Sequence, residues 1–138
     1  MKRSIVYIII LIAFLGIGFS SCENDPEPYP ADAREAFAGI WLVTETETKL
    51  TYEVTVELDS KALNGRVFIS NFANAGSSSN PANAYVSGIT ITLGINEVIG
   101  DGWIVNGSGI LSGSTINWPY TLDNGADLLH ISAIYTRH

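Results

Sequence analysis

Residues 51–58 alternate strictly between apolar and polar side chains. The apolar set is Tyr52, Val54, Val56 and Leu58, and the polar set is Thr51, Glu53, Thr55 and Glu57. Successive side chains of a β-strand point to opposite faces, so a period of two predicts a strand with one face in a core and the other in water. Helical periodicity is nearly absent, and only residues 31–36, after Pro30, indicate a helical turn.

Segments of the same kind recur at short intervals along the chain. They cover residues 37–47, 50–58, 65–71, 84–86, 88–93, 102–111, 115–122 and 126–136. The strongest turn signal between them is Asn124-Gly125, because both central residues of a type I′ hairpin need positive φ. Short strands joined by tight turns indicate an antiparallel meander, which closes as a barrel or folds as a sandwich. We therefore predict one all-β domain over residues 36–138.

The presumed inner faces carry bulky side chains that can fill a small barrel. They are Trp41, Val43, the Tyr52 set, Val67, Ile69, Ile89, Ile91, Leu93, Trp118, Tyr120, Leu122, Leu129, Ile131, Ala133 and Tyr135. An eight-stranded barrel holds side chains or one small ligand, so a closed interior is favoured over a pocket. Gly107 and Gly109 share a face with Trp103 and are expected to leave space there. We place any ligand site at these three residues, with Tyr85 as a further aromatic contact.

Two segments are expected to depart from regular strands. Pro119 cannot donate a ladder hydrogen bond, so it predicts a sheet edge or a bulge. Residues 71–83 are polar and lack periodicity, so they predict a mobile surface loop.

The first 22 residues form a secretion signal of the lipoprotein type. Lys2 and Arg3 precede an apolar run over residues 5–19, and Ser20-Ser21 stand before Cys22, the only cysteine. A run of about 15 residues is shorter than the roughly 20 that a membrane helix needs, although an uncleaved helix is the alternative interpretation. We predict a signal peptide over residues 1–21 and a proline-rich linker over residues 22–35.

This segment resembles the lipobox of bacterial lipoproteins. The resemblance implies a diacylglycerol thioether on Cys22 and an acylated amino terminus, with acyl chains such as palmitate, and several such chains hold a protein at a membrane almost permanently. Glu23-Asn24-Asp25 resemble the acidic export tag of Bacteroidetes lipoproteins, and they are equally well explained as solvated linker charges. We expect a protein anchored by Cys22 in the outer membrane of a Gram-negative bacterium, with exposure on the cell surface left open.

Charge limits the classes of partner. Removal of the signal peptide takes Lys2 and Arg3 with it and leaves five basic residues against 14 acidic ones, a net charge of about −9. This excess opposes binding to nucleic acid and to anionic lipid head groups, because both need Lys and Arg to neutralise phosphates. It favours a cationic partner, or it serves solubility alone.

No motif of the mature chain indicates catalysis, a metal or a cofactor. His130 and His138 fall short of the three or four converging ligands that zinc needs. The serines at 77–79 lack a nucleophile elbow. Alternation explains the carboxylates on adjacent strands as an outer face rather than a glycosidase-like pair; they are Glu45, Glu47, Glu53 and Glu57. We therefore expect no enzyme, no metal site and no cofactor.

Gly39-Ile40-Trp41 opens the first predicted strand and resembles the Gly-x-Trp of lipocalins and other calycin barrels. The resemblance implies that Trp41 plugs one end of the barrel and that Arg137 packs over its ring. Residues 67–72, 86–91, 107–109 and 134–137 resemble a family of uncharacterised Bacteroidetes lipoproteins with calycin-like barrels. Both likenesses imply a small eight-stranded antiparallel meander barrel, and neither assigns an activity.

Together these observations predict a lipid-anchored binding or accessory module of the cell envelope. In the first hypothesis its barrel binds a small apolar molecule or a glycan. In the second hypothesis the protein is an interaction module whose acidic surface binds a cationic protein, in the way that a protein inhibitor does. An open cavity at Trp103 and Gly107 would favour the first hypothesis, and a packed interior with an exposed aromatic and acidic patch would favour the second.

Overall fold

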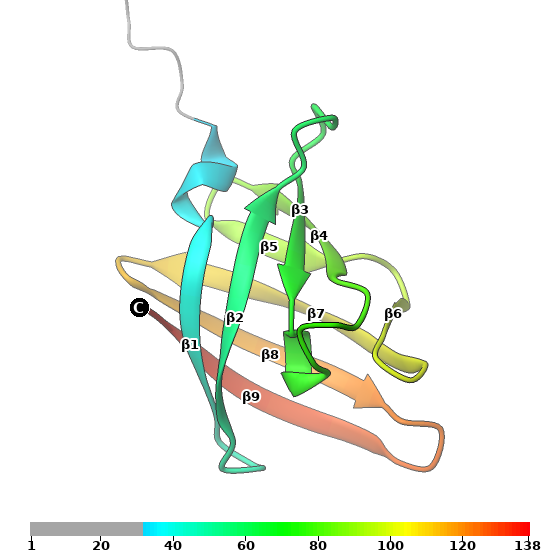
Figure 1. Ribbon diagram of the computed structural model, residues 1–138. Helices are drawn as coiled ribbons and strands as arrows, with labels where there is room; N and C mark the ends of the chain where they lie inside the picture. Colours follow the sequence, from blue (N-terminus) through cyan, green and yellow to red (C-terminus); the bar gives the residue numbers. More distant parts are fainter. Residues whose placement is uncertain (1–31) are drawn as a thin grey trace, which may run out of the picture.

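The computed structural model describes residues 32–138 (Figure 1). The predicted signal peptide, Cys22 and the linker as far as residue 31 lie outside the described residues. The strands are β1 (Gly39–Glu45), β2 (Thr51–Leu58), β3 (Arg66–Ser70), β4 (Ala82–Ser87), β5 (Thr90–Leu93), β6 (Glu97–Ile99), β7 (Trp103–Ser112), β8 (Thr115–Asp123) and β9 (Leu128–Arg137), and two 3-10 turns are η1 (Ala33–Ala36) and η2 (Phe72–Asn74). Within residues 32–138 no helix has the length and apolar character needed to cross a membrane.

Eight of the strands form one closed antiparallel barrel. Strands β1 to β5 pair in sequence order, as do β7 to β9, while the pairs β1–β9 and β5–β7 close the circuit. The short strand β6 lies on the same edge of β7 as β5, nearer the start of β7. Each of the eight predicted segments overlaps one barrel strand, and closure excludes the sandwich. The fold is the calycin-like barrel that the sequence predicts.

Alternation along the strands builds the core. Its largest side chains are fully buried and include Trp41, Trp118, Tyr135, Phe37 and Phe72. Two residues predicted to be in the core are exposed instead, Ile89 at 62% and Leu129 at 40%. Ile89 lies in the turn between β4 and β5, outside the alternation. Leu129 precedes the part of β9 that pairs with β1, where the barrel opens.

One end of the barrel is closed by the segment before β1. Trp41 donates from Nε1 to the carbonyl of Phe37 at 2.7 Å. The guanidinium carbon of Arg137 lies 4.2 Å from the Trp41 ring centroid, and its Nη2 donates to the carbonyl of Ala36 at 2.6 Å. Gly39 has a φ of +113°, and a Cβ there would approach Nη1 of Arg137 to 3.2 Å. Gly39, Trp41 and Arg137 thus adopt the cation-over-aromatic arrangement that the resemblance implies.

The turn η1 ties this closure to the loop between β2 and β3. Nη1 of Arg34 lies 3.0 to 3.1 Å from the carbonyl oxygens of Asp59, Ala62 and Arg66. Asp32 caps η1 by accepting from the backbone N–H of Arg34 at 3.0 Å. Arg34, which lies in the predicted linker, is thus hydrogen-bonded to the barrel domain.

Part of the predicted surface loop, residues 71–83, belongs to the core. Phe72 of η2 is 1% exposed, and its ring centroid lies 5.3 Å from that of Trp118 and 5.0 Å from that of Tyr120. The prediction was wrong here because the single aromatic residue stands among polar neighbours and shows no period. Residues Phe72 and Ala73 of η2 therefore belong to the core.

Pro119 lies neither at an edge nor at a bulge. It is in β8, which pairs with β7 on one side and β9 on the other. The pairing of β7 with β8 is interrupted between the pairs Gly107–Tyr120 and Ile110–Asn117, whose register is the same on both sides of the gap. A local gap in the ladder thus accommodates the missing N–H of proline.

The segment Asn124-Gly125 forms a longer turn than predicted. Asp123 pairs with Leu128, so four residues connect β8 and β9 instead of the two of a type I′ hairpin. Oδ1 of Asn124 accepts from the backbone N–H groups of Ala126 and Asp127 at 2.9 and 2.8 Å. The side chain of Asn124 therefore holds the turn together.

Candidate functional site

The two ends of the barrel differ. At the closed end, η1 leads into the start of β1 and lies on the same side of the barrel as the β2–β3 loop (Figure 1). At the open end, the β1–β2 turn, η2, the β8–β9 turn and the start of β7 surround the opening. The described chain begins at the closed end, with Asp32 beside η1. The open end therefore lies opposite to Asp32 and η1.

A recessed cavity of about 170 Å³ lies at the open end. We call it the mouth pocket, and it is lined by Glu45, Thr48, Leu50, Ala73, Trp103, Tyr120, Leu122, Asn124, Leu129 and Ile131. An apolar cavity of about 150 Å³ is large enough to hold benzene. The mouth pocket therefore has room for a single ring or a short chain. A mostly apolar lining with a few polar groups is typical of small-molecule sites.

Glu45 is the buried acidic group of the mouth pocket, with an exposed fraction of 3%. Its Oε1 accepts from the hydroxyls of Tyr52 at 2.6 Å and Tyr120 at 2.5 Å, and its Oε2 accepts from the hydroxyl of Thr48. The prediction that Glu45 belongs to an outer face is wrong. Because β1 alternates, Glu45 shares the inward face with Trp41 and Val43.

The two tyrosines beside Glu45 act as hydrogen-bond donors. Burial raises the pKa of Tyr52 and of Tyr120 far above the ordinary value, and the hydrogen bonds to Glu45 raise them further. Both hydroxyls therefore keep their protons at any physiological pH. Glu45 thus accepts hydrogen bonds from the hydroxyls of Tyr52, Tyr120 and Thr48.

No cationic side chain neutralises Glu45 among residues 32–138. The ion pairs there join Arg34 with Asp32 and Arg66 with Asp59, and Nε2 of His138 lies 3.4 Å from Oε1 of Glu53. A buried carboxylate is costly unless it is paired or hydrogen-bonded, and here three hydroxyls supply the stabilisation. The mouth pocket thus combines an apolar wall with a negative charge that has no counter-ion in the described part of the chain.

Further acidic residues extend the negative charge of the pocket over the whole open end. Among residues 32–138, six acidic residues lie at this end, namely Glu45, Glu47, Glu97, Asp101, Asp123 and Asp127, whereas Lys49 is the single basic residue there. The closed end is balanced, with Arg34, Lys61, Arg66 and Arg137 against Asp32, Glu35, Glu57 and Asp59. Charges of one sign around an opening raise the local concentration of ligands of the opposite sign.

Comparison with known proteins assigns no family. No family model matches the chain, and no curated protein matches it. The function must therefore be argued from the site itself.

The four residues predicted to bind a ligand do not come together. Trp103 is half-buried and lines the mouth pocket. A Cβ on Gly107 would approach Cβ of Tyr120 to 2.7 Å, and one on Gly109 would approach the Trp118 ring to 2.8 Å. The predicted space on the glycine face is therefore filled by aromatic side chains. Tyr85 lies 40% exposed on β4 and lines neither this pocket nor the grooves described next.

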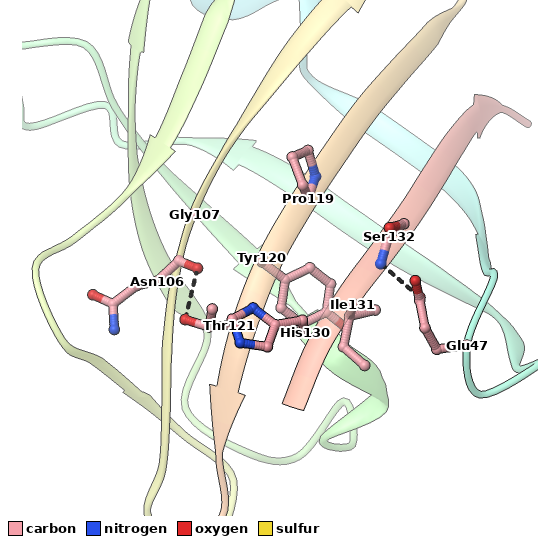
Figure 2. Close-up of a pocket in the computed structure, with 9 residues that line it drawn as sticks. All are labelled: Glu47, Asn106, Gly107, Pro119, Tyr120, Thr121, His130, Ile131 and Ser132. Atoms are coloured by element: carbon pink, nitrogen blue, oxygen red, sulfur yellow. Dashed lines mark hydrogen bonds between the residues drawn. The ribbon is translucent and has the colours of Figure 1, made fainter. Parts of the chain in front are cut away.

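Two grooves lie on the outer surface of the barrel around Pro119. The first has a volume of about 300 Å³ and crosses β7, β8 and β9 between Asn106 and Glu47 (Figure 2). In it, Oγ1 of Thr121 donates to the Asn106 carbonyl at 3.4 Å, and Oε2 of Glu47 accepts from the Ser132 backbone N–H at 2.7 Å. The second has a volume of about 370 Å³. Both are open to solvent along the sheet, so they cover a ligand on one side only.

Chemically, the mouth pocket is suited to binding. Within residues 32–138, no three or more His, Cys, Asp or Glu side chains are placed to hold a metal ion. The backbone N–H of Ser132 holds the pKa of Glu47 below its ordinary value, but Glu47 lines the outer groove and not the pocket. Glu45 is therefore the one carboxylate that the pocket presents to a ligand. One carboxylate orients a ligand, whereas acid–base chemistry of the glycosidase kind uses two.

Proposed function

We propose that this protein is a non-catalytic binding module that holds one small molecule in the mouth pocket. A single observation carries the proposal: a cavity of about 170 Å³ with mostly apolar walls contains a buried carboxylate. Aliphatic side chains such as Leu50, Leu122 and Leu129 outnumber the polar groups in its lining. This lining favours a ligand with an apolar body over a glycan, whose many hydroxyls would lack partners.

We further propose that Cys22 anchors the protein in the outer membrane. The signal-like residues 1–21 and the resemblance to Bacteroidetes lipoproteins support this assignment. Because the linker joins the barrel at η1, the mouth pocket would face away from the membrane. The Cys22→Ser variant should move from the membrane fraction to the soluble fraction, while a Ser20→Ala control should stay in the membrane. Retention of Cys22→Ser in membranes would contradict the anchor.

The binding proposal can be tested by NMR on the full chain. Small single-ring probes such as benzyl alcohol should shift the backbone amide signals of the β1–β2 turn, η2 and the β8–β9 turn. The signals of η1 and the β2–β3 loop at the closed end should stay unchanged. Shifts confined to other surfaces, or none at millimolar probe, would contradict the proposal.

A matched pair of variants sharpens this test. Leu129→Trp places a large ring in the rim of the pocket, at a residue that is 40% exposed and so tolerates the change. Leu63→Trp makes the same substitution in the β2–β3 loop at the closed end, where Leu63 is fully exposed. Probe binding should be lost in the first variant and kept in the second.

A second function, the capture of a cationic protein, is favoured by the charge of the open end. Six acidic residues and one basic residue surround the mouth. A small basic protein such as lysozyme should then bind more weakly to Asp123→Asn/Asp127→Asn than to the control Glu35→Gln/Glu57→Gln at the closed end. The difference should shrink at high salt, because exposed charges are screened. Equal binding by both variants would contradict this second function.

A further inference from the structure

We infer that the mouth pocket selects ligands that carry an amine on a small apolar body. This inference rests on the proposed binding function and adds the chemical class of the ligand. It follows from the environment of Glu45, which is 3% exposed and lines a pocket open to small molecules.

The hydrogen-bonding capacity of Glu45 leaves a place for one more donor. A carboxylate offers about four lone-pair sites on its two oxygens. Tyr52 and Tyr120 occupy two sites on Oε1, and Thr48 occupies one on Oε2. The remaining site belongs to Oε2, the oxygen that accepts the hydrogen bond from Thr48. Thr48 itself lines the pocket. A ligand N–H donor at this position completes the set.

Charge favours a cationic donor over a neutral one. The three hydroxyls stabilise the carboxylate of Glu45 but leave its charge uncompensated among residues 32–138. An ammonium group in the pocket supplies both the missing donor and the opposite charge, and such charge-assisted bonds are roughly twice as strong as neutral ones. An anionic ligand meets like-charge repulsion in the same place.

The volume of the pocket and the negative charge of the open end both agree with a small amine as the ligand. A cavity of about 170 Å³ admits one ring with a short substituent. The acidic residues of the open end, which include Asp123 and Asp127, attract cations from a distance and repel anions. Benzylamine therefore matches the pocket, whereas benzyl alcohol has the same shape without the charge and benzoate has the opposite charge.

The test is isothermal titration of the purified full-length protein with these three probes. We expect benzylamine to bind about 10- to 100-fold more tightly than benzyl alcohol, and benzoate to bind more weakly than either. Equal or tighter binding of the alcohol would overturn the amine selectivity and leave the proposed function intact. Failure of all three probes to bind would overturn the proposed function as well.

Variants of the pocket residues test whether the preference for amines depends on Glu45. In Glu45→Gln, the affinity for benzylamine should fall to that for benzyl alcohol, while the alcohol keeps its affinity. If Glu45→Gln does not fold, the rim residue Leu129 supplies the same test, because it is 40% exposed. Leu129→Lys should then weaken benzylamine at least tenfold relative to Leu129→Met, with little change for the alcohol. Equal affinities of benzylamine for these two variants would contradict the inference.

Discussion

The guanidinium carbon of Arg137 lies 4.2 Å from the ring centroid of Trp41. The final side chain of the last strand, β9, thus packs on a tryptophan of the first strand, β1. The same guanidinium donates to the carbonyls of Ala36 and Ala38. A flat group with several donors can stack and hydrogen-bond at once, which an ammonium cannot do. Arg137 therefore closes the barrel by joining β9, β1 and the segment after η1.

We predict that Arg137→Lys lowers the free energy of unfolding by about 1 to 2 kcal/mol, because it loses the stacking and one of the two carbonyl contacts. The measurement is urea unfolding followed by tryptophan fluorescence. Lys61→Met, which removes an exposed charge from the β2–β3 loop, serves as control and should change stability by less than about 0.5 kcal/mol. Unchanged stability in Arg137→Lys, which keeps the positive charge, would show that the charge matters and the stacking does not.

Gly109 is required for packing rather than for an opening. A Cβ there would lie 2.8 Å from Cγ2 of Ile116 and 2.8 Å from the ring of Trp118. We predict that Gly109→Ala lowers stability by about 1 to 3 kcal/mol, because the core must shift to relieve the overlap. Thermal unfolding measures the effect, with the exposed neighbour Ser108→Ala as control. An unchanged melting temperature in Gly109→Ala would mean that space exists there after all.

Most of the fold could be predicted from the sequence because a period of two is a local property. The alternation of Tyr52, Val54 and Val56 predicts both the strand and its buried face, and the structure confirms both. Phe72 was missed because its burial depends on contacts with Trp118 and Tyr120, far away in the sequence. No local pattern reports such contacts.

The candidate site was less predictable, although one signal was present. Glu45 stands two residues after Val43 and four after Trp41, so alternation alone places it inside. The prediction instead grouped Glu45 with the carboxylates of the adjacent strand and placed all of them on an outer face. For Gly107 and Gly109 the missing side chains were taken as free space, whereas the space is filled by residues of β8 that the sequence cannot place beside them.

The hydroxyls around Glu45 should contribute to stability. We predict that Tyr52→Phe and Tyr120→Phe each lower the free energy of unfolding by about 1 to 3 kcal/mol, because each removes a hydrogen bond to a buried carboxylate. Tyr85→Phe is the matched control, since Tyr85 is 40% exposed, and it should have little effect. Chemical unfolding of the three variants checks this. If all three variants lose equal stability, the hydroxyl bonds to Glu45 are not the cause.

Alkaline pH should unfold the barrel through its buried tyrosines. Burial raises the pKa of Tyr52, Tyr120 and Tyr135 well above that of tyrosine in an unfolded chain, which is about 10. The folded state therefore keeps protons that the unfolded state releases, so the stabilisation is fully present below pH of about 10 and is lost as the pH rises further. Each such tyrosine lowers stability by about 1.4 kcal/mol per pH unit above that point.

The measurement for this prediction combines tyrosinate absorbance with circular dichroism in one alkaline titration. The absorbance of the three buried tyrosines should rise together with the loss of β-structure, in a single cooperative step. In Tyr52→Phe/Tyr120→Phe, the dependence of stability on pH above about 10 should be shallower, because two of the three groups no longer titrate. Ionisation of all tyrosines while the barrel stays folded would contradict the prediction, since it requires a solvent-accessible interior.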